Sequence, residues 1–156
     1  MSARACAKMV GVNTYDISTD PGRLQLEAIH AYLTRSYWSP GVPRSVVARA
    51  IANSLCFGIY LGGEQVGFAR LVTDKATFAY LADVYVLEAH RGQGLSKRLV
   101  AQIQAHPELQ GLRRILLATR DAHGLYAQFG FNPLAKPETM MEIRNLDAYG
   151  TGQTGA

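Results

Sequence analysis

The pattern of apolar and polar residues divides the chain into a helical first part, a run of strands and a mixed last part. Asp20-Pro21 is typical of a helix start, and the apolar residues after it recur with helical spacing as far as about Ser36. A loop with two prolines and a glycine follows over residues 37–43. The spacing then predicts a second helix over about Ser45–Ser54.

Strand patterns dominate the middle of the chain. Leu55–Leu61 and Gln65–Val72 flank the dipeptide Gly62-Gly63, an arrangement that predicts a β-hairpin. After a polar turn at residues 73–75, Ala76–Leu87 is predicted to form a long third strand. Together these segments predict an antiparallel meander.

The period changes again after the third strand. Gly94–His106 is predicted to be a helix, Arg114–Ala118 a short buried strand parallel to its predecessor, and Ala122–Phe129 a further helix. Phe131–Pro133 and Met140–Ile143 are predicted to supply short closing strands. The expected fold is therefore mixed α/β, with a central, mostly antiparallel sheet flanked by helices and one β-α-β crossover.

The composition favours one folded domain over residues 1–156. The chain is 48% hydrophobic and 18% charged, so it can bury a core without a disulfide or a metal. Residues 1–9 and 147–156 have little to bury, and we expect both segments to be flexible.

Cys6 and Cys56 lack the spacing of a zinc site, so no metal is expected. Without a recognisable signal peptide or membrane span, we expect a cytoplasmic protein with no membrane partner.

The charge of the chain is mildly basic. Its formal net charge is +4, and no long run of lysine or arginine is present. Such a field attracts a polyanionic ligand, for example a nucleotide cofactor. Since no nucleic-acid-binding motif accompanies it, we expect no nucleic-acid partner.

The segment Arg91-Gly92-Gln93-Gly94-Leu95-Ser96 lies between the third strand and the next helix. The first N–H groups of a helix lack partners within the helix, and the helix dipole adds partial positive charge there. Gly92 and Gly94 allow a ligand to approach the backbone, and Arg91 can add a charge-assisted bond. Two glycines also suit a simple tight connection. The lysine of a P-loop and a GxGxxG fingerprint are missing, which disfavours a nucleoside triphosphatase and a Rossmann dehydrogenase.

These residues resemble the Arg/Gln-x-x-Gly-x-Gly/Ala signature of the GNAT acetyltransferases, which hold the pyrophosphate of coenzyme A on the amides of this turn. The sequence departs from the signature at Ser96, whose N–H is retained. The preceding Val84-Tyr85-Val86 resembles the family strand that bonds the pantetheine arm. The resemblance therefore implies acetyl-coenzyme A as co-substrate, bound by the strand and by residues 91–96.

A second segment, Ala122-His123-Gly124-Leu125-Tyr126-Ala127-Gln128-Phe129-Gly130-Phe131, resembles the Ala-x-x-Leu-Tyr-x-x-x-Gly-Phe segment of the same family. The resemblance places Tyr126 near the cofactor sulfur, where a phenol can protonate the leaving thiolate. Thr119 stands where many members carry an asparagine that touches the cofactor arm. The resemblance covers roughly residues 55–145.

The general base and the acceptor pocket are less clearly marked. Asp83 interrupts an apolar strand, and His123 is of the residue type that most often serves as a base at neutral pH, so both are candidate bases. The alternatives are an Asp83 paired with an arginine or tyrosine, a surface or capping His123, and a chain of water molecules. Tyr37 and Trp38 are candidates for binding the acceptor, by stacking or by holding a cation; the alternative for Trp38 is a role in the core.

The expected function is N-acetyl transfer from acetyl-coenzyme A to a primary amine, of a small molecule or a protein, by direct attack in a ternary complex. The main alternative is a GNAT-like domain that binds coenzyme A without catalysis. A small basic nucleic-acid binder is a second alternative, disfavoured by the scattered charge. Exposed strand edges in this layout would also suit a homodimer.

Overall fold

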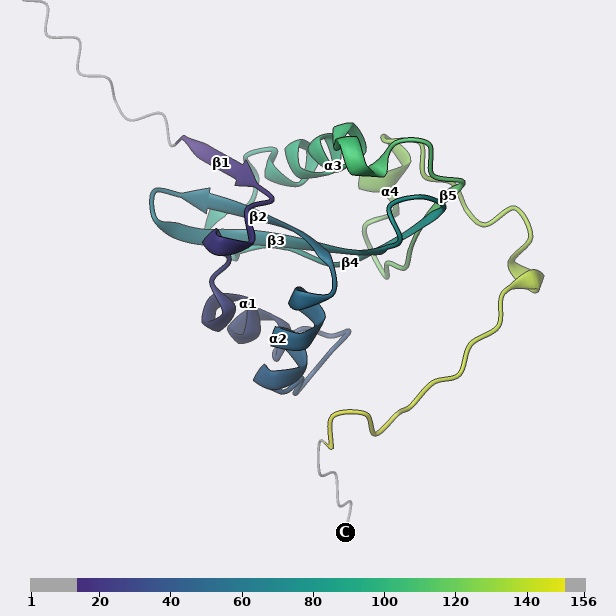
Figure 1. Cartoon of the computed structure of the whole chain (residues 1–156), viewed down its shortest axis with the longest axis horizontal. Coiled ribbons are helices and arrows are strands. Elements are labelled where there is room, and N and C mark those ends of the chain that lie inside the picture. The colour runs from purple at the N-terminus through teal and green to yellow at the C-terminus, as the bar shows by residue number, and fades with distance from the viewer. Residues whose placement is uncertain (1–13, 151–156) are drawn as a thin grey trace, which may run out of the picture.

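The computed structural model describes residues 14–150 and contains a five-stranded sheet in the order β1-β2-β3-β4-β5 (Figure 1). The first four strands pair antiparallel and the last pairs parallel with β4. The mixed α/β fold with a mostly antiparallel sheet is confirmed. The strands are β1 (Tyr15–Ser18), β2 (Leu55–Leu61), β3 (Glu64–Thr73), β4 (Phe78–Val86) and β5 (Arg114–Leu117).

Helices cover both faces of the sheet. The chain places α1 (Leu26–Leu33) and α2 (Arg44–Ala52) on one face, and α3 (Leu95–Ala105) and α4 (His123–Ala127) on the other (Figure 1). The single-turn 3-10 helices cover Pro21–Arg23, Glu88–His90, Pro107–Leu109 and Pro137–Thr139. Within residues 14–150, none of the helices is both long and apolar enough to cross a membrane.

The two layers of helices explain why the central strands are apolar on both sides. Along β2, Phe57 and Ile59 belong to the core cluster on the α3 side, whereas Cys56 belongs to the cluster under α1 and α2. Successive side chains of a strand point to opposite faces, so a strand between two layers is buried along its whole length. The predicted hairpin of β2 and β3 is confirmed with nearly the expected boundaries.

The first helical segment is shorter than predicted. The Asp20 carboxylate accepts a hydrogen bond from the Gly22 amide at 2.9 Å, as a capping residue does, but the capped element is a single 3-10 turn. The α-helix begins only at Leu26 and ends at Leu33. The sequence reasoning also missed β1, because four residues are too few to show a period.

The predicted closing strands at Phe131–Pro133 and Met140–Ile143 are wrong, because neither segment pairs with the sheet. Residues 132–148, which we call the carboxy-terminal strap, instead leave the α4 side of the molecule and run around the β5 edge (Figure 1). At its end Tyr149 packs against the cluster under α1 and α2. Of the segments 1–9 and 147–156, which were expected to be flexible, residues 1–9 and 151–156 lie outside the described residues.

Candidate functional site

A β-bulge in β4 opens the sheet at the site. Arg70 pairs with Ala82 and Phe68 with Tyr85, so two residues of β4, Asp83 and Val84, stand opposite one residue of β3. Asp83 adopts a left-handed φ of 56°, which is strained for a non-glycine residue. A bulge bends its strand. Accordingly β4 pairs with β5 only as far as Leu81, and the two parallel strands part beyond it.

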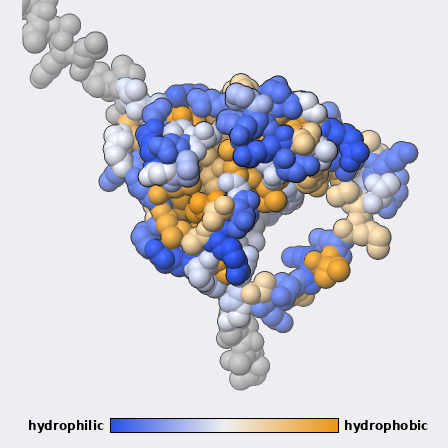
Figure 2. All heavy atoms as spheres, in the orientation of Figure 1, coloured by the Kyte–Doolittle hydropathy of each residue, from blue (hydrophilic) through white to orange (hydrophobic). Residues whose placement is uncertain are grey.

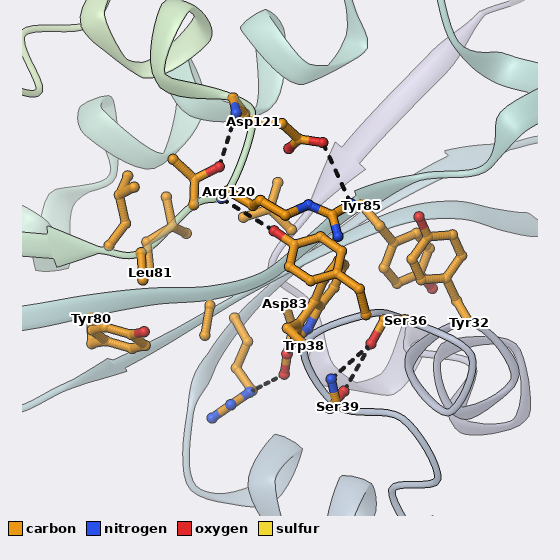
Figure 3. A pocket seen from close by; sticks show the side chains of 18 of the residues that line it. Tyr32, Ser36, Trp38, Ser39, Tyr80, Leu81, Asp83, Tyr85, Arg120 and Asp121 are labelled. Atoms are coloured by element: carbon orange, nitrogen blue, oxygen red, sulfur yellow. Dashed lines mark hydrogen bonds and ion pairs between the residues drawn. The ribbon is translucent and has the colours of Figure 1, made fainter. Parts of the chain in front are cut away.

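The parted strands form one side of a large pocket with a volume of about 990 Å³ (Figure 3). The loop between α1 and α2 forms another side, and Tyr126 from α4 reaches in from the opposite face. Residues 82–86 of β4 have no strand partner on the β5 side, so main-chain groups on that side are open to a ligand. The lining includes Ala82, Asp83, Val84, Tyr85, Leu117, Ala118 and Thr119.

The turn after β4 presents unbonded amides, as predicted from the sequence. Gly92 and Gly94 have φ angles of 78° and 75°, a left-handed conformation that favours glycine. The first intrahelical bond runs from the Arg98 amide to the Gly94 carbonyl at 3.1 Å. Within residues 14–150, the amides of residues 92–97 donate no hydrogen bond to the chain. Unpaired amides at the start of an eleven-residue helix are suited to binding an anion.

The strand that sequence reasoning missed braces this turn. The Tyr15 hydroxyl in β1 lies 2.9 Å from His90 Nδ1 and accepts a hydrogen bond from Gln93 Nε2 at 3.0 Å. The Tyr15 carbonyl also accepts a bond from Arg98 Nη2 at 3.1 Å. His90 and Gln93 therefore connect the turn to the sheet through their side chains.

Two arginines join the turn to the first helical segment. Arg91 Nε donates to the Val86 carbonyl at 2.9 Å and its Nη2 to the Tyr32 hydroxyl at 3.0 Å. The guanidinium thus holds the turn closed, and its expected bond to a phosphate stays a prediction. Arg35 pairs with Glu88 at 2.8 Å, and this contact lowers the pKa of the Glu88 carboxyl to about 2.

Tyr126 has the environment of a proton donor. Its ring packs edge-on against Phe131 with centroids 5.7 Å apart, and only 7% of the residue is exposed. The hydroxyl forms no hydrogen bond with the described part of the chain, and the residue lines the pocket. Burial, with a smaller contribution from Tyr37, raises the pKa of Tyr126 to about 12. The phenol is therefore fully protonated at neutral pH.

Asp83 is paired rather than free. Its carboxylate accepts hydrogen bonds from Trp38 Nε1 at 2.9 Å and Arg70 Nε at 2.8 Å (Figure 3). The Arg70 and Asp83 side chains are only 18% and 12% exposed. This is the paired alternative stated above, and the role of Asp83 as a base stays a prediction. Sequence reasoning missed Arg70, whose partner lies 13 residues away on the next strand.

The aromatic pair predicted for the acceptor side lies at the pocket. Tyr37 and Trp38 both line it, with ring centroids 5.0 Å apart. The Tyr37 hydroxyl accepts a bond from the Arg120 amide at 3.3 Å, and the Arg120 guanidinium lies 3.8 Å from the centre of the Tyr37 ring. Thr119 also lines the pocket, and its Oγ1 accepts a bond from the Ala122 amide at 3.0 Å.

A further aromatic contact at the pocket had no signal in the sequence. Tyr32 of α1 stacks on Tyr85 with centroids 3.9 Å apart and an interplanar angle of 10°. The Tyr85 side chain therefore points to the α1 face, where burial raises its pKa. Only the backbone of Tyr85 faces the space between the parted strands.

Other predicted residues lie away from the pocket. His123 is exposed at the start of α4 and is not among the lining residues. The Leu95 side chain is buried in the core, so only the amide of this residue belongs to the exposed turn. Ser96 follows it in the first turn of α3. Among residues 14–150, no group of three histidine, cysteine or acidic side chains could hold a metal ion.

Comparison with known proteins adds independent findings. The acetyltransferase (GNAT) family matches residues 14–131 of this chain. A Gibberella zeae protein named "Putative acetyltransferase FG08082" is 35% identical over 137 residues, covering 73% of this chain and 76% of the relative.

Solved structures share the fold. A crystal structure from Xanthomonas campestris pv. campestris, described as a "putative acetyltransferase belonging to the gnat family", is 49% identical, has a TM-score of 0.86, and matches 90% of this chain and 100% of that one. An acetyltransferase structure from Clostridium acetobutylicum that contains acetyl-coenzyme A has a TM-score of 0.61, with 84% of this chain and 95% of that one matched. At 12% identity the second likeness shows the fold alone.

Proposed function

Because the chain belongs to the GNAT acetyltransferase family, we propose that it transfers the acetyl group of acetyl-coenzyme A to a primary amine bound in the pocket described above. The observation that carries the proposal is one continuous arrangement along β4. The unbonded amides of residues 92–97 follow the parted stretch of this strand, and Tyr126, whose hydroxyl has no partner among residues 14–150, lines the pocket beside that stretch.

The chain offers a separate contact for each part of the co-substrate, which supplies an activated acetyl thioester. The amides of residues 92–97 suit the diphosphate, since they are unpaired and lie at a helix N-terminus. The free main-chain side of residues 82–86 suits the amide groups of the pantetheine arm. An N–H from Val84–Val86 can also stabilise the negative charge that develops on the thioester oxygen.

Tyr126 is proposed as the general acid. Its raised pKa keeps the proton on the phenol at neutral pH, and its hydroxyl has no competing partner within the described residues. It can therefore donate that proton to the leaving sulfur. A ring held against Phe131 has a fixed direction, so donation requires no rearrangement of α4.

Asp83 is proposed to orient the acceptor amine. Trp38 donates a hydrogen bond to one carboxylate oxygen of Asp83, and Arg70 donates to the other. Asp83 also lines the pocket between the parted strands. A carboxylate fixed in this way attracts an ammonium group and can hold it in one position. Tyr37 and Trp38 give the acceptor an aromatic surface on the same side.

Direct transfer between the two bound substrates fits the side chains present. Cys56 is 5% exposed, lies outside the pocket lining, and has its pKa raised to about 11 by burial. A thiol in that environment is a poor nucleophile, because the thiolate is the reactive form. The pocket gains its effect by holding both substrates in line.

The test is an acceptor screen that measures release of the free thiol of coenzyme A. Small amines, peptides with free lysines and peptides with free N-termini are each incubated with the protein and acetyl-coenzyme A, with blanks that lack the amine. Thiol release that depends on one class of amine supports the proposal. Tight binding of acetyl-coenzyme A without release in any class would favour a non-catalytic coenzyme A-binding domain.

A further inference from the structure

One wall of the pocket carries opposite charges at its two ends. We call it the two-charge wall, and its residues, in order of contact, are Arg120, Tyr37, Trp38 and Asp83. The Arg120 guanidinium lies 3.8 Å from the centre of the Tyr37 ring, and the centroids of the two aromatic rings are 5.0 Å apart. At the other end Trp38 Nε1 donates to the Asp83 carboxylate at 2.9 Å. Two rings therefore separate a cation from an anion, and Figure 3 shows the Arg120 and Asp83 side chains apart in the pocket.

The Arg120 guanidinium is open to a ligand. Within residues 14–150 it donates no hydrogen bond to the chain, and its ion-pair contact, with Asp121, is 3.9 Å long. The two side chains of that pair are 65% and 69% exposed. Because an exposed ion pair of this length contributes little, the N–H donors of Arg120 can bind an incoming carboxylate.

Other arginines that line the pocket are already engaged. Arg35 donates two hydrogen bonds to Glu88, at 2.8 and 3.2 Å. Arg70 is held by Asp83, and Arg91 by the carbonyl and hydroxyl groups named above. Among the pocket residues that the structure describes, the cation at the end of the two-charge wall is thus the one left for an anion on the acceptor.

The two rings between the charges are exposed and fixed in place. Tyr37 is 48% exposed and Trp38 is 38% exposed, whereas hydrophilic residues cover most of the outer surface on the face seen in Figure 2. The Tyr37 hydroxyl accepts a bond from the Arg120 amide, and the Trp38 N–H is bound by Asp83. With their polar atoms already bonded, the rings offer a ligand mainly apolar surface.

We propose that the acceptor is a small zwitterion, in which an apolar spacer joins a primary amine to a carboxylate; this inference rests on the proposed function. The ammonium group lies at Asp83, the spacer lies on the two rings, and the carboxylate binds Arg120. In an α-amino acid both charged groups are attached to one carbon atom. Such a molecule cannot reach both ends of the two-charge wall.

The reaction changes only one end of this acceptor. The nitrogen forms a bond to the carbonyl carbon of the thioester, the carbon–sulfur bond breaks, and the sulfur takes a proton from Tyr126. The ammonium group loses two protons in all: one restores the Tyr126 phenol and the other goes to solvent. The product is an amide without a cation, so its attraction to Asp83 is lost, which favours release.

The test compares acceptors that share a benzylic amine and differ at the opposite end of the ring. 4-(Aminomethyl)benzoate carries a carboxylate there, benzylamine a hydrogen, and 1,4-bis(aminomethyl)benzene a second amine. Release of the thiol of coenzyme A gives kcat/KM for each. We expect kcat/KM to be about 5-fold or more higher for 4-(aminomethyl)benzoate than for benzylamine, as for a partly exposed charged contact. Phenylalanine should gain nothing over phenethylamine, because its carboxylate is beside the amine.

Variants of Arg120 make the test specific to the two-charge wall. In Arg120→Met the ratio of kcat/KM between 4-(aminomethyl)benzoate and benzylamine should fall to about one. In Arg120→Glu the order should reverse, with 1,4-bis(aminomethyl)benzene preferred over the benzoate. Arg44→Met is the matched control, since it removes the same charge from an exposed position outside the pocket lining and should keep the wild-type ratio. Circular dichroism melting checks that each variant is folded.

The outcomes separate this inference from the function on which it rests. Acetyl transfer to small amines with no preference for the carboxylate, or a preference that survives in Arg120→Met, would overturn the zwitterionic acceptor and leave acetyl transfer standing. Release of thiol with peptides alone would do the same. If no amine or peptide released thiol, both proposals would fall.

Discussion

Replacing Gly94 with alanine adds one methyl group to the turn that is proposed to bind the diphosphate. Gly94 has a φ of 75°, and an L-residue in this left-handed conformation costs about 1–2 kcal/mol. An ideal Cβ at this position would meet no heavy atom within 4 Å. The substitution therefore adds backbone strain and a methyl group on the open side of the turn, without a clash inside the protein.

The strain translates into weaker binding of the co-substrate. Without a bound anion the turn can relax out of the left-handed conformation, and binding must then restore it. A cost of about 1–2 kcal/mol corresponds to a dissociation constant about 5–30 times higher. We expect Gly94→Ala to weaken acetyl-coenzyme A binding by that factor in titration calorimetry.

Gly111 provides the matched control. It has a φ of 73°, its ideal Cβ also meets nothing within 4 Å, and it lies in the connection before β5, outside residues 92–97. Gly111→Ala should lower the free energy of unfolding by a similar amount and leave the affinity unchanged. A wild-type affinity in Gly94→Ala, or an equal loss of affinity in both variants, would refute the assignment of this turn to the diphosphate.

Three further predictions concern the pocket. Tyr126→Phe should lower kcat by about 100- to 10,000-fold with unchanged acetyl-coenzyme A affinity, because the ring keeps its packing against Phe131 and loses only the proton; an unchanged kcat would remove the phenol from the mechanism. Since the raised pKa of Tyr126, about 12, keeps the active protonated form to higher pH, kcat should not fall near pH 10 through this group; a decline there that Tyr126→Phe abolishes would contradict it. Arg70→Met should lower the free energy of unfolding by about 3 kcal/mol in urea denaturation, because it leaves the Asp83 carboxylate without its cation. The double variant Arg70→Met/Asp83→Asn should recover part of this loss. No recovery would argue against a stabilising Arg70–Asp83 pair.

Local patterns were sufficient to predict the elements that carry the site. The β2–β3 hairpin follows from a two-residue period on either side of Gly62-Gly63. The turn after β4 follows from two glycines between a strand and a helix, and both glycines have a left-handed φ in the structure. In both segments the information lies within a few neighbouring residues.

Contacts between distant segments were not predictable in this way. Tyr15 braces the turn across 75 residues to His90, and no local pattern marks either residue. Asp83 was recognisable as a carboxylate in an apolar strand, but its left-handed φ depends on the register with β3. The closing strands failed for a related reason: the pattern at Met140–Ile143 is that of a strand, but a strand also needs a partner, and this segment pairs with none of the strands within residues 14–150.

The most direct test of the proposed function is a crystal structure with coenzyme A bound. The diphosphate oxygens should lie within hydrogen-bonding distance, about 2.7–3.2 Å, of amides from residues 92–97. The sulfur should lie beside the Tyr126 hydroxyl, between the parted ends of β4 and β5. Coenzyme A bound elsewhere, or with its sulfur remote from the Tyr126 hydroxyl, would contradict the account.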